Sequence, residues 1–443
     1  MGIVLVYRLL SYPLVDDVSS QSRVTFHDYY ETDPIDILFV GPSHTVRFLN
    51  AEQMTKELGI SVYNLGTIDQ ELVGSYYLIK DAIENKGIKK IYFEISISRL
   101  FKKHSISTSV FIITDYFKNF IYKVRLVLGE LKSEEYLNAF RLRRSVEPLK
   151  FSMSQVTDLV EKKKEAKYTE YKGDKRYNGR GQWTIKRGYT DDGGYAFNVS
   201  TGSIDDYTID EIKDRQIEYF RDIIRFCNER NVELVIYIPP YTEVYKQYYE
   251  DYWLITDMVK SIVSEEGGKI IDLNLVKDEY LKLSQSDFYL QDHPNYNGGI
   301  KISSFLAQYI RDPNDDYFVS SVSEKYPNQD DVTAVAYLAE YKTKKKKYYV
   351  IDKVKGKLQS IDVKLWAQGY HKIPAIAKMW TTTYDESSNK YIEDEEIVGT
   401  KEDEYVTDFS FETNALDKMY IIKLYNPDTG EQIYQAYTKF DED

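Results

Sequence analysis

The stretch that decides the fold reads Ile35-Asp36-Ile37-Leu38-Phe39-Val40-Gly41-Pro42-Ser43-His44. Residues 35–40 form an almost continuous apolar run, which is typical of a strand buried on both faces of a parallel sheet. The run ends at Gly41, and a serine follows two residues later. This pattern predicts the first strand of an α/β sheet, with a polar loop directly after it.

The same alternation continues outward from this strand. Helical patterns separate further apolar runs, as expected when helices connect parallel strands. The strands are expected at residues 61–66, 90–95, 232–238 and 269–273, and the helices at 70–85, 211–230, 252–265 and 297–310. Residues 31–312 therefore predict a doubly wound parallel sheet flanked by helices.

Residues 101–210 interrupt this alternation. They contain helical pieces at 110–128 and 133–140, followed by a stretch rich in Lys, Arg, Gly and Tyr without a clear period. We interpret them as an insertion over the carboxyl edge of the sheet. Because ligands of open α/β sheets bind at that edge, the insertion is expected to shape a substrate site.

The pattern changes after a linker at residues 313–330. From 331 to 443 the apolar residues recur with period two, and Asn426-Pro427-Asp428-Thr429-Gly430-Glu431 is a hairpin signal. These features predict a C-terminal all-β, sandwich-like domain of about 110 residues, the size of an immunoglobulin-like module.

Composition excludes several function classes. The net charge of −13 disfavours nucleic acid as a partner, because an acidic surface repels phosphate groups. The single cysteine, Cys227, cannot form an intrachain disulfide or a cysteine-based zinc site. The five histidines show no metal-ligand spacing and no glycine-rich phosphate loop occurs, so we expect neither a metal nor another cofactor.

The N-terminal segment, residues 1–30, begins with an apolar run over 2–14. This run is too short to span a bilayer, which takes about 20 apolar residues, and it lacks the features of a signal peptide. Two interpretations stay open: a buried helix or strand of the domain, or the trailing end of a longer membrane anchor.

Two polar residues are candidates for nucleophilic chemistry. Ser43 follows the first strand, and its amide is expected near the positive end of the next helix, where it can bind a developing oxyanion. A serine is a poor nucleophile until a base accepts its proton, and His293 precedes the last helix of the sheet domain. Both loops belong to the carboxyl edge. The alternatives are an ordinary N-cap serine and a polar loop histidine.

The second strand ends in Asn64-Leu65-Gly66. A glycine there can bring its backbone N–H close to the same crevice, although a plain turn glycine fits as well.

Taken in order, the three blocks at 41–44, 64–66 and 287–299 resemble the SGNH (GDSL-like) hydrolase superfamily. The likeness is strongest to its cell-envelope branch, which includes the teichoic-acid D-alanylation protein DltD and the AlgX-like polysaccharide acetyltransferases. It covers about residues 30–312 without the insertion. The resemblance implies that Ser43 attacks an acyl carbon and that His293 takes its proton. It also implies that the Ser43 and Gly66 amides form the oxyanion hole, and that Asn64 braces the turn.

Two departures from the superfamily pattern concern the acid and the oxyanion hole. The acid usually stands three residues before the histidine, where this chain has Leu290; the nearest acids are Asp292 and Asp287. We favour Asp292, because a bend before Pro294 would free it from pointing away from its neighbour, while a dyad without an acid remains open. The third block reads Glu94-Ile-Ser-Ile-Ser-Arg instead of Gly-x-Asn-Asp, so the oxyanion hole is either incomplete or completed by another group.

Two functions are consistent with this sequence. The first is a serine esterase or O-acyltransferase that modifies a cell-envelope polymer, such as teichoic acid or exopolysaccharide, through an acyl-serine. Such an enzyme would lie on the extracellular face of the membrane and would have a membrane acyl-donor protein as a further partner. The second is a catalytically weak scaffold that binds glycan or protein at the cell surface, which Leu290 favours.

Overall fold

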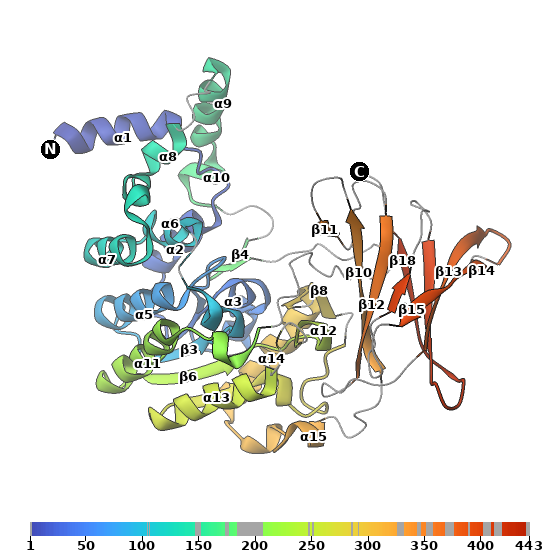
Figure 1. The fold of residues 1–443 in the computed structure, drawn as a ribbon. Coiled ribbons are helices and arrows are strands. Elements are labelled where there is room, and N and C mark those ends of the chain that lie inside the picture. Colours follow the sequence, from blue (N-terminus) through green and yellow to red (C-terminus); the bar gives the residue numbers. More distant parts are fainter. Residues whose placement is uncertain are drawn as a thin grey trace.

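The computed structural model describes most of the chain. The described residues are 2–103, 105, 107–146, 152–172, 177–183, 207–246, 249, 252–284, 287–290, 292–325, 332–342, 347–350, 358–367, 376–388, 390–401, 409–411 and 419–439. They form a helix-flanked α/β part and a C-terminal all-β part (Figure 1).

A five-stranded sheet forms the centre of the α/β part. Its strands pair in the order β2-β1-β3-β6-β7, and every pair is parallel. The predicted parallel sheet is thereby confirmed. The strands are β1 (Ile37–Val40), β2 (Val62–Asn64), β3 (Lys90–Glu94), β6 (Glu233–Ile238) and β7 (Lys269–Asp272).

Helices cover both faces of this sheet (Figure 1). Side chains of β1 alternate between the two faces: Leu38 and Val40 join one core cluster, and Ile37 and Phe39 join the other. This double burial explains the continuous apolar run of the first strand. One face is covered by α5 (Leu72–Lys86), α11 (Asp214–Glu229) and α13 (Tyr252–Glu265), the other by α4 (Ala51–Leu58) and α14 (Tyr296–Arg311).

The strand order fixes where a ligand site is expected. The chain leaves β1 towards β2 on one side and returns to β3 on the other, so the connections reverse direction beside β1. In doubly wound sheets such a switch point opens a crevice at the carboxyl ends of the strands. The loops after β1 and β3 border this crevice.

The described residues of the insertion form mainly short helices. The expected helical stretch at 110–128 is divided into α6 (Ser107–Thr114) and α7 (Phe120–Glu130), because Asn119 caps α7 by accepting a hydrogen bond from the Tyr122 amide. The expected helical piece at 133–140 is a 3₁₀-helix, η2 (Ser133–Ala139). It is followed by α8 (Arg141–Val146), α9 (Met153–Lys164), α10 (Ala166–Thr169) and a small hairpin of β4 (Tyr177–Gly179) and β5 (Gln182–Trp183).

The N-terminal apolar run is α1 (Gly2–Leu14), which lies beside α8 and α9 (Figure 1). It precedes α2 (Gln21–Glu31). Val6, Leu9 and Leu10 are exposed, so α1 is a helix but is not buried along its whole surface. Among the described residues, no helix combines the length and the apolar character needed to cross a bilayer.

The C-terminal part is all-β, as predicted, and its described strands pair in antiparallel fashion. One sheet has the order β11-β10-β12-β16-β15 and the other β14-β13-β17-β18. The strands are β10 (Val332–Lys342), β11 (Lys347–Val350), β12 (Leu358–Ala367), β13 (Ile376–Asp385), β14 (Lys390–Ile397), β15 (Gly399–Lys401), β16 (Phe409–Phe411), β17 (Met419–Tyr425) and β18 (Gln432–Lys439). The expected hairpin turn joins β17 to β18, and Gly430 there has a φ of +72°.

Candidate active site

Ser43 is the first residue of α3 (Ser43–Phe48), and only Gly41 and Pro42 separate it from the end of β1. The turn between them is very tight. A Cβ at Gly41 would lie 2.2 Å from Thr45 Oγ1 and 2.6 Å from Glu94 Cβ, so only glycine fits between α3 and β3. This close approach places the Ser43 hydroxyl at the carboxyl edge of the sheet.

Gly41→Ala should destabilise the protein by about 1–3 kcal/mol, because the added methyl group overpacks a site bounded by a helix and a strand. Thermal denaturation of the two proteins measures the difference. Gly129→Ala is the matched control: no atom lies within 4 Å of the added Cβ, and alanine is the better helix former. Equal melting temperatures for Gly41→Ala and the wild-type protein would contradict the tight packing.

His293 lies 250 residues after Ser43 in the sequence, yet its side chain contacts Ser43. It begins β9 (His293–Pro294), which pairs with β8 (Phe288–Leu290) just before α14. Asn295 caps α14 by accepting hydrogen bonds from the amides of Asn297 and Gly298, which fixes the end of this loop. His293 Nε2 lies 2.8 Å from Ser43 Oγ. The structure thus brings together the two residues that the sequence singled out.

Asp292 is the acid that contacts His293. Its Oδ1 lies 2.5 Å from His293 Nδ1. Asp292 occupies a turn and not extended backbone, so adjacent side chains need not point to opposite faces. Asp287 is engaged elsewhere: it pairs with Lys301 at 2.8 Å and accepts a hydrogen bond from the Ser284 amide. A continuous hydrogen-bonded chain therefore runs from Ser43 through His293 to Asp292.

Asn64 and Gly66 connect the turn after β2 to α3. Asn64 Nδ2 donates to the carbonyl oxygens of Thr45 (2.6 Å) and Leu49 (3.2 Å). Its Oδ1 accepts a hydrogen bond from the Gly66 amide at 3.0 Å. The Gly66 amide was expected to donate to an oxyanion. In the structure it donates to the Asn64 side chain instead. The Ser43 amide, in the first turn of α3, is the remaining predicted donor.

Two site residues escaped the sequence analysis as functional groups. His44 Nδ1 lies 2.7 Å from Glu94 Oε1, and His44 Nε2 lies 3.4 Å from Asp292 Oδ2. Glu94 Oε2 accepts hydrogen bonds from both the amide (2.8 Å) and the hydroxyl (2.6 Å) of Thr45. An acid at the end of an apolar strand is unusual. Because a buried carboxylate needs partners, Glu94 was the feature of the sequence that could have indicated these contacts.

The charges of His44, Asp292 and His293 shift one another's pKa values. Burial alone would lower the pKa of His44, but Glu94 and Asp292 raise it to about 9. Burial would raise the pKa of Asp292, yet the two neighbouring histidines hold it well below its usual range. Burial lowers the pKa of His293 and the His44 charge adds to this, while Asp292 opposes it. At neutral pH the site therefore contains a carboxylate between a neutral and a positively charged imidazole.

The same residues are close enough to hold a metal ion. Within the described ranges, His44, Asp292 and His293 form the group whose ligand atoms all lie within 4.8 Å of one another. In this arrangement each ring nitrogen of His293 already faces another partner, Ser43 or Asp292. The interactions observed are those of a hydrogen-bonded chain.

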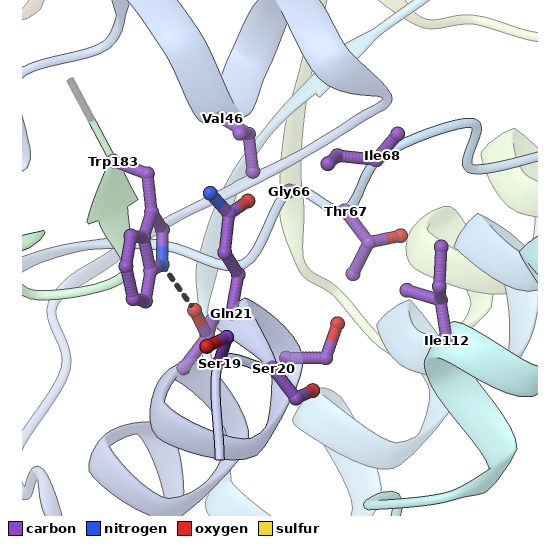
Figure 2. A pocket seen from close by; sticks show the side chains of 11 residues that line it. Ser19, Ser20, Gln21, Val46, Gly66, Thr67, Ile68, Ile112 and Trp183 are labelled. Carbon is purple, nitrogen blue, oxygen red and sulfur yellow. Dashed lines mark hydrogen bonds between the residues drawn. The ribbon is translucent and has the colours of Figure 1, made fainter. Parts of the chain in front are cut away.

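A cavity of about 290 Å³ adjoins the turn at Gly66 (Figure 2). Trp183 of the insertion closes one side, where its Nε1 donates to the Thr25 hydroxyl at 2.8 Å. Backbone contact between the Arg180 carbonyl and the Asn64 amide also holds the insertion at this place. The lining residues are Ser19, Ser20, Gln21, Ser22, Thr25, Val46, Gly66, Thr67, Ile68, Ile112 and Trp183.

No protein-family model matches this chain, and no curated protein matches it. Thirty chains of solved structures do match. A GDSL-like lipase from Bacteroides thetaiotaomicron is 7% identical, with 67% of this chain and 100% of that chain covered and a TM-score of 0.31. A catalytic mutant of an acetylxylan esterase from Geobacillus stearothermophilus is 12% identical (66% and 100% covered, TM-score 0.27).

A lipase/acylhydrolase from Enterococcus faecalis is 9% identical, with 63% of this chain and 96% of that chain covered and a TM-score of 0.27. All three are distant similarities. The function proposed below therefore rests on the hydrogen-bonded residues of this chain and their chemistry.

Proposed function

We propose that this chain is a serine esterase or O-acyltransferase that acts through an acyl-serine at Ser43. The observation that carries the proposal is the unbroken chain of hydrogen bonds from Ser43 Oγ through both ring nitrogens of His293 to Asp292. Nucleophile, base and orienting acid in this order are the arrangement that activates a serine hydroxyl.

Each group has a defined role in the reaction. Ser43 Oγ attacks the acyl carbon of an ester while its proton passes to His293 Nε2, and Asp292 stabilises the imidazolium that forms. His293 then gives the proton to the leaving alcohol. Water or a sugar hydroxyl attacks the acyl-serine, with His293 again as base, and releases the acid or the new ester.

The proposed substrate is a cell-envelope polymer, such as teichoic acid or exopolysaccharide, on the extracellular face of the membrane. The sequence resemblance supports this choice, and so does the cavity beside Gly66, whose serine and threonine hydroxyls suit a polyhydroxylated chain. A membrane acyl-donor protein would be the partner if the reaction is a transfer. The alternative is a weak scaffold that binds glycan or protein.

A serine-directed fluorophosphonate tests the proposal. We expect it to label the wild-type protein once, and peptide mapping should place the adduct on Ser43. Labelling requires an activated serine, since the hydroxyl must lose its proton to a base. Absence of labelling in the folded protein would favour the non-catalytic scaffold instead.

The pH dependence of labelling should reflect His293. Only the neutral imidazole accepts a proton from Ser43, so the rate should fall as pH decreases through the pKa of His293. That pKa is held below its ordinary value, mainly by burial. We therefore expect the acid limb of the rate profile to lie below pH ~6.5, the usual histidine value. A limb clearly above that value would contradict this assignment.

A further inference from the structure

We propose that His44 is a positioning residue of this site: held by Glu94, it holds Asp292 in the orientation that serves His293. The proposal rests on the proposed function for its catalytic consequence. Its structural part, the contact of His44 with two carboxylates, does not depend on turnover.

The geometry gives each oxygen of Asp292 its own imidazole. Oδ1 lies 2.5 Å from His293 Nδ1, and Oδ2 lies 3.4 Å from His44 Nε2. Asp292 is adjacent to His293 in the sequence, so rotation about its own side-chain bonds could turn it away. A second hydrogen bond, from a different element of the fold, restricts that rotation and keeps the carboxylate facing His293.

His44 is itself fixed by the end of β3. It is 3% exposed, and its Nδ1 bonds Glu94, whose other oxygen holds the amide and hydroxyl of Thr45. Glu94 thereby holds both Thr45 and His44 in the first turn of α3. One carboxylate thus sets both the helix that carries Ser43 and the group that orients the acid.

The protonation of His44 follows from its neighbours. The groups that face it are the carboxylates of Glu94 and Asp292, the ring of His293, and the Tyr241 ring, which is nearly perpendicular to His44 at a centroid distance of 5.6 Å. Donation to two carboxylates requires a proton on both ring nitrogens. The two carboxylates also raise the pKa of His44 to about 9, so the ring is positively charged at neutral pH.

Charge balance explains why Glu94 accompanies His44. A positive charge beside His293 disfavours the imidazolium that catalysis must form, and Glu94 offsets that charge. Asp292, His44 and Glu94 together then carry one net negative charge, as a lone aspartate would. The site gains a fixed acid without losing the field that stabilises the protonated base.

Three variants separate positioning from a merely structural role. In His44→Gln, one amide must face two carboxylates, so its oxygen opposes either Glu94 or Asp292. In Glu94→Gln, His44 loses one proton but still donates to Asp292, while the new amide group donates to its other nitrogen. In the double variant, the amide introduced at position 94 donates to the amide oxygen introduced at position 44. The amide nitrogen at position 44 then donates to Asp292, which restores a consistent chain of donors.

The measured quantity is the fluorophosphonate labelling rate of Ser43 across pH, with circular dichroism and thermal melting as checks of folding. We expect His44→Gln to slow labelling about tenfold to a hundredfold, as expected for a hydrogen bond to a charged group. Its acid limb should move to higher pH, because a positive charge beside His293 is removed. Glu94→Gln should lose a few-fold at most, and the double variant should recover most of the rate lost in His44→Gln.

Two outcomes would overturn the proposal. One is wild-type labelling and an unchanged acid limb in His44→Gln. The other is a folded double variant as slow as His44→Gln, because a general packing defect, and not the donor chain, would then explain the loss.

Nuclear magnetic resonance of the ¹⁵N-labelled histidines tests the contact without any turnover. The five histidines make assignment practical, since the His44→Gln spectrum lacks one of them. At pH 7 we expect both ring nitrogens of His44 to carry protons in the wild-type protein and only one in Glu94→Gln. A singly protonated His44 in the wild-type protein would refute the proposal. If the wild-type serine is not labelled but His44 is doubly protonated, the proposed function fails while the inferred contact stands.

Discussion

Ser43→Ala is expected to lower acyl-ester turnover by roughly a millionfold, the loss seen when the nucleophile of a serine triad is removed. The His293 Nε2 atom faces the Ser43 hydroxyl at 2.8 Å, so the substitution removes the group whose proton the base would accept. Ser43 is only half-buried and alanine is a good helix former, so the melting temperature should stay close to that of the wild-type protein. Hydrolysis of p-nitrophenyl acetate and thermal melting measure the two effects.

Ser304→Ala provides the control for Ser43→Ala. Ser304 is an exposed serine on α14 that bonds Glu57, far in the sequence from the proposed nucleophile, and its loss should leave turnover unchanged. Undiminished hydrolysis by Ser43→Ala would rule out Ser43 as the nucleophile. An equal loss in Ser304→Ala would mean that a serine-to-alanine change lowers turnover without removing the nucleophile, and the assignment would then lose its support.

Asp292→Asn should reduce turnover by roughly a hundredfold or more, as expected when the acid of a triad no longer selects the histidine tautomer. The Asn amide can donate to His293 Nδ1, which then leaves Nε2 protonated and unable to accept the Ser43 proton. Asp287→Asn is the matched control, because Asp287 pairs with Lys301 and not with the histidine. Its turnover should remain near that of the wild-type protein.

Steady-state hydrolysis across pH distinguishes the possible outcomes. A large loss in Asp287→Asn alone would reverse the assignment of the acid. Near-native rates in both variants would leave a Ser43–His293 dyad, provided that Ser43→Ala is inactive. If Ser43→Ala also keeps the wild-type rate, the chain is better described as a binding scaffold.

The architecture was predictable because it depends on local patterns. The apolar run at residues 35–40 reflects β1, which is buried on both faces, and the period-two patterning from residue 331 onward reflects antiparallel strands. Ser43 and His293 were predictable for a related reason. Each stands at an end of such an element, and all carboxyl ends of a parallel sheet meet at one edge.

The remaining parts of the site depend on contacts that no local pattern encodes. His44 looks like a helix residue beside a serine, and its role becomes visible only when Glu94 of β3 and Asp292 converge on it. The engagement of the Gly66 amide depends on the rotamer of Asn64, two residues earlier. The turn at Asp292 likewise arises from the pairing of β8 with β9, which is too short for a sequence pattern to reveal.

The long separation between Ser43 and His293 has a consequence for the newly made chain. Ser303 of α14 donates to the Phe48 carbonyl and accepts from the Asn50 amide, so the last helix of the α/β part docks directly on α3. The ribosome synthesises Ser43 about 250 residues before His293. If Ser43 acts as the proposed nucleophile, it lacks its base during this interval, and we expect it to become reactive only once His293 lies beside it. Acquisition of fluorophosphonate reactivity during refolding would then time this docking event, and we expect a fragment that ends before His293 to remain inert.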